Sequence, residues 1–143
     1  MDARSRTDAE RSAWAATALS AGLAGIAVAD QVTLGWTHHD VTAHYGAFGL
    51  NPAPEVLTSF LAAASLGAAA TFAGTALLTR HGRRKSAIAT AGLALVLGVA
   101  VACLTTFAFE YDDHVFTTFW RFAPWVLPLA AGAVCALIAS RSR

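Results

Sequence analysis

Residues 86–109 read SAIATAGLALVLGVAVACLTTFAF and contain no charged side chain. At a rise of about 1.5 Å per residue, a helix over this segment is about 36 Å long, which is enough to cross a hydrocarbon layer roughly 30 Å thick. Three more segments are free of charged residues, namely 12–29, 56–79 and 122–140. The sequence therefore predicts four membrane-spanning helices.

The composition leaves no room for a separate soluble domain, because 56% of the 143 residues are hydrophobic and only 13% are charged. We predict an all-α fold, an integral membrane four-helix bundle that forms a single transmembrane domain over residues 1–143. The expected spans are 13–36, 54–79, 86–110 and 118–140, joined by outer loops 37–53 and 111–117 and an inner loop 80–85. Glycine and proline in 37–53 favour turns, with a short helix before Gly46 as the alternative. In the fourth span, Pro128 should bend or loosen the helix.

The basic residues predict the orientation of the chain. Of the 10 Lys and Arg residues, all except Arg121 lie in the N-terminus, in the loop 80–85 or at the C-terminus. Because Lys and Arg near span ends stay in the cytoplasm, both termini should be cytoplasmic, with the spans running up-down-up-down. We expect a multi-pass protein of the plasma (cytoplasmic) membrane of a bacterium.

The basic inner loop has lipid rather than nucleic acid as its expected partner. Cations next to a membrane are attracted to anionic headgroups by about 1 kcal/mol each. So small a patch held at a membrane does not suit nucleic acid. The predicted headgroup-binding residues are Arg80, Arg83, Arg84 and Lys85.

A signal peptide is the alternative to the first span, because Ala27-Val28-Ala29 before Asp30 has the small-residue pattern of a cleavage site. We expect the span to be retained. Trp14 and Trp36 bracket a segment about 33 Å long by helical rise, a spacing that fits the two interfacial belts.

Small residues recur four apart in every span and predict close helix packing, since lipid gives helices no hydrophobic reason to associate. These residues are Ala21 and Gly25, Ala63 and Gly67, Ala70 and Gly74, Ala94, Gly98 and Ala102, and Gly132, Ala136 and Ser140.

Most of the histidines and many acids fall in the two outer loops, which share one end of the bundle. Imidazole and carboxylate groups are ligands for zinc, copper, iron and manganese. A divalent metal is therefore the cofactor that these loops would take, although the spacing matches no diagnostic motif, and a solvated polar loop is the alternative. The candidate ligands are His38, His39, Asp40, His44, Glu110, Asp112 and His114.

Asp30 should lie about 9 Å below Trp36 by helical rise, inside the outer part of the bundle. A carboxylate at that depth is costly and needs a partner. Arg121, near the start of the fourth span, is the basic residue at a comparable level. We therefore predict an intramembrane Asp30–Arg121 pair, which either joins the first and fourth helices or lines a polar pocket.

Aromatic residues gather at the outer boundary. They suit an interfacial belt, and aromatics beside an arginine also suit a partner surface. The candidate partner surface comprises Tyr45, Phe48, Phe119, Trp120 and Trp125.

No nucleophile motif or phosphate-binding loop occurs in the sequence, so we do not expect an enzyme. The leading hypothesis is a non-enzymatic accessory, assembly or structural membrane protein that packs against another membrane protein or a second copy of itself. The alternative is a metal or small-ligand binding, transport or sensing protein. An enzyme is third, because it would need Asp30, His39, Glu110, His114 and Arg121 to share one pocket.

Overall fold

The computed structural model describes residues 3–50, 53–110 and 113–140. Helix α1 covers Ala3–Ala29 and continues into a π-helix over Asp30–Leu34. The later helices are α2 (Trp36–Gly46), α3 (Pro54–Arg80), α4 (Arg84–Phe107), α5 (Thr118–Phe122), a 3-10 turn (Ala123–Trp125) and α6 (Val126–Ala139). Two antiparallel two-residue strands, β1 (Phe109–Glu110) and β2 (Asp113–His114), join α4 to α5.

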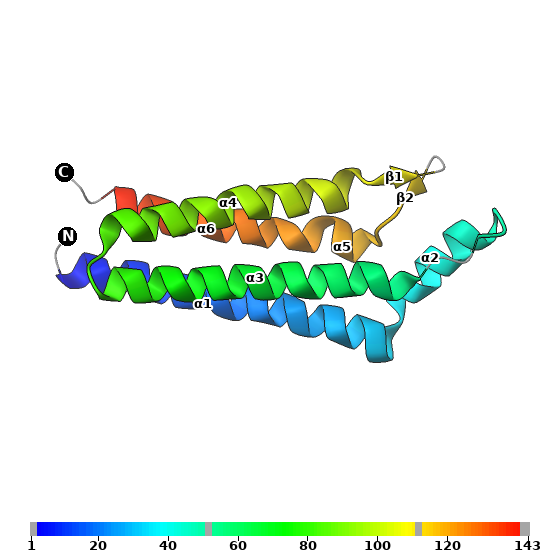
Figure 1. Cartoon of the computed structure of the whole chain (residues 1–143), viewed down its shortest axis with the longest axis horizontal. Helices are drawn as coiled ribbons and strands as arrows, with labels where there is room; N and C mark the ends of the chain where they lie inside the picture. Colours follow the sequence, from blue (N-terminus) through cyan, green and yellow to red (C-terminus); the bar gives the residue numbers. More distant parts are fainter. Residues whose placement is uncertain (1–2, 51–52, 111–112, 141–143) are drawn as a thin grey trace.

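Four of these helical segments are long and apolar enough to span a membrane: Arg6–Leu34, Pro54–Arg80, Arg84–Phe107 and Thr118–Ala139. They lie side by side along the long axis of the molecule (Figure 1). The start of α1, the α3–α4 turn and the end of α6 lie at one end, called here the inner end. Helix α2 and the strand pair lie at the other, outer end. The all-helical character of the spans and their number are as predicted.

The four helices form a ring in which α1 contacts α3, α3 contacts α4, α4 contacts α6 and α6 contacts α1. Toward the inner end the core is built largely from alanines around Phe72, including Ala13, Ala76 and Ala91. Toward the outer end it contains larger side chains, among them Leu61 and Trp120. Small side chains allow helix backbones to approach closely, which is how helices associate in lipid.

Large apolar side chains cover the outside of the bundle. Val32, Phe107 and Leu129 are each exposed over most of their surface, and they come from three different sides of the ring. Water would disfavour so much exposed apolar area, whereas lipid tails accept it. The four helices therefore indicate contact with a lipid bilayer.

The first part of the expected outer loop 37–53 is helical, which confirms the alternative of a short helix before Gly46. Helix α2 occupies Trp36–Gly46, and only the residues after it resemble the predicted loop. After α2 the chain forms turns. The backbone N–H of Phe48 donates to the carbonyl oxygen of Tyr45, and that of Gly49 donates to the carbonyl oxygen of Gly46. The reason for the helix is a carboxylate from outside the segment, described below, which binds the first backbone N–H groups of α2.

The fourth span is irregular one turn before Pro128. Proline has no N–H for the carbonyl four residues earlier, and its ring crowds that carbonyl, which here belongs to Pro124. Pro124 lies in the 3-10 turn Ala123–Trp125, so the loosening predicted for Pro128 appears four residues before it.

Of the predicted small-residue stripes, the one on α4 is buried throughout. Ala94, Gly98 and Ala102 all lie inside the bundle. A Cβ atom at Gly98 would lie 2.9 Å from the backbone nitrogen of Pro128, so glycine is what lets α4 and α6 touch at this level. In contrast, the residues of the stripes Ala21–Gly25 and Ala63–Gly67 are exposed, and a Cβ atom added at Gly25 or Gly67 would meet no atom within 4 Å.

We predict that Gly98→Ala destabilises the protein by about 1–3 kcal/mol, because the new methyl group meets backbone rather than a movable side chain. Gly92→Ala, on the same helix, is the matched control, since a Cβ there meets no atom within 4 Å. It should leave stability unchanged or raise it slightly. SDS-induced unfolding in mixed micelles, followed by circular dichroism, measures both variants. Equal stability of the two would contradict the close α4–α6 contact.

Candidate polar site at the outer end of the bundle

The chain turns sharply at the outer end of α1. Gly35 has φ of 67°, a left-handed conformation that glycine adopts without steric cost. Its N–H donates to the carbonyl oxygen of Asp30 at 2.8 Å, which closes the π-helix. Helix α2 begins at the next residue and leads away from the bundle (Figure 1).

The side chain of Asp30 is the centre of this corner and is only 1% exposed. Its Oδ1 atom accepts hydrogen bonds from the backbone N–H groups of Trp36 at 2.7 Å and Thr37 at 3.2 Å. Its Oδ2 atom accepts from the Thr37 hydroxyl at 2.6 Å and from the indole N–H of Trp120 at 2.8 Å. Both oxygens therefore have two donors.

These hydrogen bonds explain why a carboxylate is tolerated at this depth. Burial of an unpaired charge is very costly, and donors aimed at both oxygens offset that cost. Two of the donors are first-turn N–H groups of α2, which a helix cannot satisfy by itself. The negative charge also lies at the positive end of α2. Asp30 thus fixes the start of α2 and, through Trp120, connects it to α5.

The expected partner of Asp30, Arg121, does not contribute to this network. None of the four hydrogen bonds to Asp30 comes from Arg121, and the described residues contain no ion pair between the two. The Arg121 guanidinium lies over the Phe122 ring, 5.3 Å from its centroid, and its Nε atom has no hydrogen-bond partner. Neighbouring helix residues point about 100° apart, so Trp120 and Arg121 face different directions, and it is Trp120 that faces Asp30.

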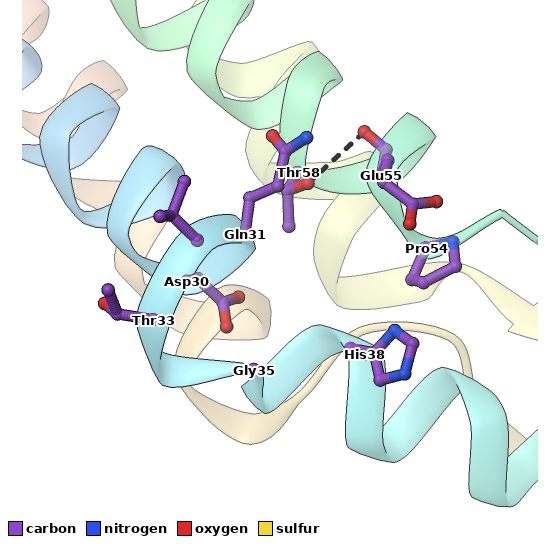
Figure 2. Close-up of a pocket in the computed structure, with 9 residues that line it drawn as sticks. Asp30, Gln31, Thr33, Gly35, His38, Pro54, Glu55 and Thr58 are labelled. Atoms are coloured by element: carbon purple, nitrogen blue, oxygen red, sulfur yellow. Dashed lines mark hydrogen bonds between the residues drawn. The ribbon is translucent and has the colours of Figure 1, made fainter.

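The first of two cavities at this corner lies between the π-helix and α3. This α1–α3 cavity has a volume of about 230 Å³. Figure 2 shows Gln31 extending from the π-helix toward Thr58 of α3, with Pro54 and Glu55 at the start of α3 and His38 contributed by α2. The Thr58 hydroxyl donates to the backbone carbonyl of Glu55 at 3.2 Å.

The second cavity lies between the start of α2 and the start of α5. This α2–α5 cavity has a volume of about 540 Å³ and is lined by Leu34, Gly35, Trp36, His39, Asp40, Thr117, Thr118 and Phe119. His39 Nδ1 lies 3.2 Å from Asp40 Oδ1. The predicted enzyme set is thus divided: Asp30 lines the first cavity, His39 lines the second, and Arg121 lines neither.

The candidate metal ligands are also dispersed. Because α2 is helical, His38 and His39 point to different cavities, while His44 lies near the far end of α2 with its ring against Tyr45 and Phe48. His114 is on β2; Asp112 and the side chain of Glu110 lie outside the described part. Within the described ranges no three His, Cys, Asp or Glu residues come close enough to hold a metal ion. The structure therefore gives the metal hypothesis no support.

The aromatic set divides into buried and exposed members. Trp120 is 1% exposed, so its assignment to a partner surface is wrong; its indole is a hydrogen-bond donor inside the bundle. Trp125 is half-buried and donates from its indole to the Thr106 hydroxyl at 2.8 Å. Phe48 and Phe119 are exposed and Tyr45 is half-buried, so these three remain accessible from outside.

At the inner end, Arg84 has a structural role that the sequence did not reveal. Its Nε and Nη2 atoms donate to the carbonyls of Ile138 and Ala139, both at 3.2 Å. Those carbonyls belong to the last turn of α6, where side-chain donors commonly cap a helix, so Arg84 caps α6 rather than extending freely toward headgroups. The other residues of the predicted headgroup set, Arg80, Arg83 and Lys85, are exposed.

The fold and the corner define a small helical protein whose four long apolar helices are compatible with a multi-pass membrane protein. No protein family model, curated protein or solved structure matches this chain. Its function has to be inferred from the geometry itself.

A double-mutant cycle distinguishes Trp120 from Arg121 as the partner of Asp30. Asp30→Asn and Trp120→Phe should each destabilise the protein by about 1–3 kcal/mol, because each leaves a buried polar group without its partner. Together they should show a coupling energy above about 0.5 kcal/mol. The Asp30→Asn and Arg121→Gln pair should be close to additive. Unfolding in mixed micelles measures all variants, and a larger coupling to Arg121 than to Trp120 would contradict the assignment.

Proposed function

We propose that the chain is a non-enzymatic integral membrane protein, an accessory, assembly or structural component that acts through its helix surfaces and its outer end. In this proposal it crosses the plasma membrane of a bacterium four times, up-down-up-down, with both termini in the cytoplasm. Its partner is another membrane protein or a second copy of the chain.

The observation that best supports a non-enzymatic role is that the carboxylate of Asp30 is buried and fully hydrogen-bonded. A general acid or base, or a proton carrier, needs a carboxylate oxygen that can reach a substrate or water. Both oxygens of Asp30 are instead occupied by donors from α2 and α5, and the side chain is buried. This buried acid therefore supports a structural rather than a chemical role.

The outer end has features that suit contact with a partner. The corner at Asp30 holds α2 by its first turn, and the rest of α2 extends beyond the bundle (Figure 1). Phe48, just after α2, is 53% exposed. Aromatic side chains on a firmly held element can bind a partner with little loss of conformational freedom. Phe119, on α5, adds a second exposed ring at the same end.

The proposed orientation of the chain across the membrane is based on where its Lys and Arg residues lie. The exposed Arg80, Arg83 and Lys85 lie at the α3–α4 turn, at the same end as the start of α1 and the end of α6 (Figure 1). Cytoplasmic segments carry such an excess of Lys and Arg. The opposite end carries α2 with its histidines, which is consistent with an outward-facing position.

Cysteine labelling tests this orientation. In a background carrying Cys103→Ala and Cys135→Ala, a membrane-impermeant maleimide added to intact cells should label Thr42→Cys on α2 but not Lys85→Cys. Both wild-type side chains are exposed. After permeabilisation both variants should react, which controls for accessibility. Labelling of Lys85→Cys alone in intact cells would reverse the orientation.

Photo-crosslinking in living cells tests the accessory role. A photoreactive amino acid at Phe48 should give a discrete adduct with one membrane protein or with a second copy of the chain. The same group at Leu93, an exposed apolar position on α4, is the control and should react with lipid. For an accessory role, deletion of the chain should also lower the abundance or assembly of the crosslinked protein. Absence of any adduct at Phe48, together with a purely monomeric protein in mild detergent, would contradict the proposal.

A further inference from the structure

The α2–α5 cavity combines aromatic rings with a carboxylate at the outer end of the protein. Trp36 is the first residue of α2, and Phe119 belongs to α5. Their ring centroids lie 5.7 Å apart, and the ring planes are inclined at 60° to each other. The two rings are 43% and 39% exposed, so part of each faces the cavity rather than the core. Asp40, one turn along α2, contributes the carboxylate.

The backbone of Trp36 and the ring of Phe119 are held in place by contacts with buried groups, and the Trp36 ring packs on Phe119. The backbone N–H of Trp36 donates to Asp30, which fixes where α2 begins. Phe119 packs edge-on against the buried Trp120, with ring centroids 4.9 Å apart. A pair of rings fixed in this way does not have to be ordered when a ligand binds, so little affinity is lost to ordering.

The side chains that line the α2–α5 cavity favour a ligand with a positive charge. The faces of Trp and Phe rings carry negative electrostatic potential and attract cations. Asp40 is the acid that lines this cavity, and it adds an attraction of the same sign for a cation. Because no three ligating side chains meet in the described part of the chain, a bare metal ion is not the expected occupant. Apolar rings instead favour a cation that has an apolar surface of its own.

We propose that the α2–α5 cavity binds an organic cation of the quaternary or alkylated ammonium class, with Trp36 and Phe119 on its apolar surface and Asp40 opposite its charge. The cavity volume of about 540 Å³ accommodates such a group. The same chemistry is presented by choline-type lipid headgroups and by free organic cations. The site does not depend on a protein partner, so it goes beyond the proposed accessory role.

The test uses the full-length protein in nanodiscs and tetramethylammonium chloride as the probe. Calorimetric titration should show saturable binding, whereas sodium chloride at the same concentrations should not. Asp40→Asn and Phe119→Leu should each weaken binding by at least about threefold, as expected from typical cation–π and ion-pair energies. The matched controls are Glu55→Gln, an exposed acid of the other cavity, and Phe48→Leu, an exposed ring outside it; both should bind as the parent does.

Two nanodisc compositions distinguish the sources of the cation. The two lipids are phosphatidylcholine and phosphatidylethanolamine, which are both net neutral and so attract free cations to the surface equally. Weaker apparent binding of tetramethylammonium in phosphatidylcholine means that a choline headgroup occupies the site; equal binding means that the site is open to free cations. Equal binding by the Asp40→Asn variant and the parent, binding of sodium as strong as that of tetramethylammonium, or a titration that never saturates would each overturn the proposal. Because Asp40 is exposed, its variant should fold, and it decides the test even if Phe119→Leu does not fold.

Discussion

The outer half of the molecule depends on the hydrogen bonds that surround the carboxylate of Asp30. In hydrocarbon, an acid with unfilled oxygens would cost several kcal/mol, so its donors must arrive together when the helices assemble. They come from two places in the sequence: the first turn of α2 and the indole of Trp120, 90 residues away. The geometry of these hydrogen bonds fixes the left-handed turn at Gly35 and the direction in which α2 leaves the bundle. It also fixes the rotation of α5 that points Trp120 toward Asp30.

The two ends of the bundle are stabilised in different ways. Toward the inner end, alanines and Phe72 pack closely, and Arg84 caps the end of α6. The hydroxyls of Ser20 and Thr79 need no long-range partner, because each donates to the carbonyl four residues earlier. The outer end instead uses a buried charge and aromatic side chains. A polar network of this kind favours one arrangement of the helices strongly, since any alternative leaves donors or acceptors unpaired.

The four spans could be predicted from the sequence because absence of charge over a membrane thickness is a property of each segment alone. The contacts around Asp30 could not be predicted in the same way, because they depend on the direction in which each side chain points. Arg121 was the obvious partner for Asp30 by charge, yet the adjacent Trp120 supplies the contact, since neighbouring helix residues face different directions and Trp120 is the one that faces Asp30. The signal that could have found it was the indole N–H of Trp120, a donor adjacent in sequence to the arginine that was expected to reach Asp30. Likewise, glycine and proline in 37–53 favoured turns over the alternative of a short helix before Gly46, and the carboxylate that caps this helix lies outside the segment in sequence.

The helical state of α2 also determines what chemistry the outer end can perform. Had residues 37–53 been a flexible loop, His38, His39 and His44 could have gathered around a metal ion. On a helix held at its first turn, His38 lines one cavity, His39 the other, and His44 lies against Tyr45 and Phe48. The same rigidity that disperses the imidazoles keeps Trp36 at a fixed inclination to Phe119. The rigidity of α2 therefore both disperses the imidazoles and holds in one geometry the pair of rings on which the proposed cation site depends.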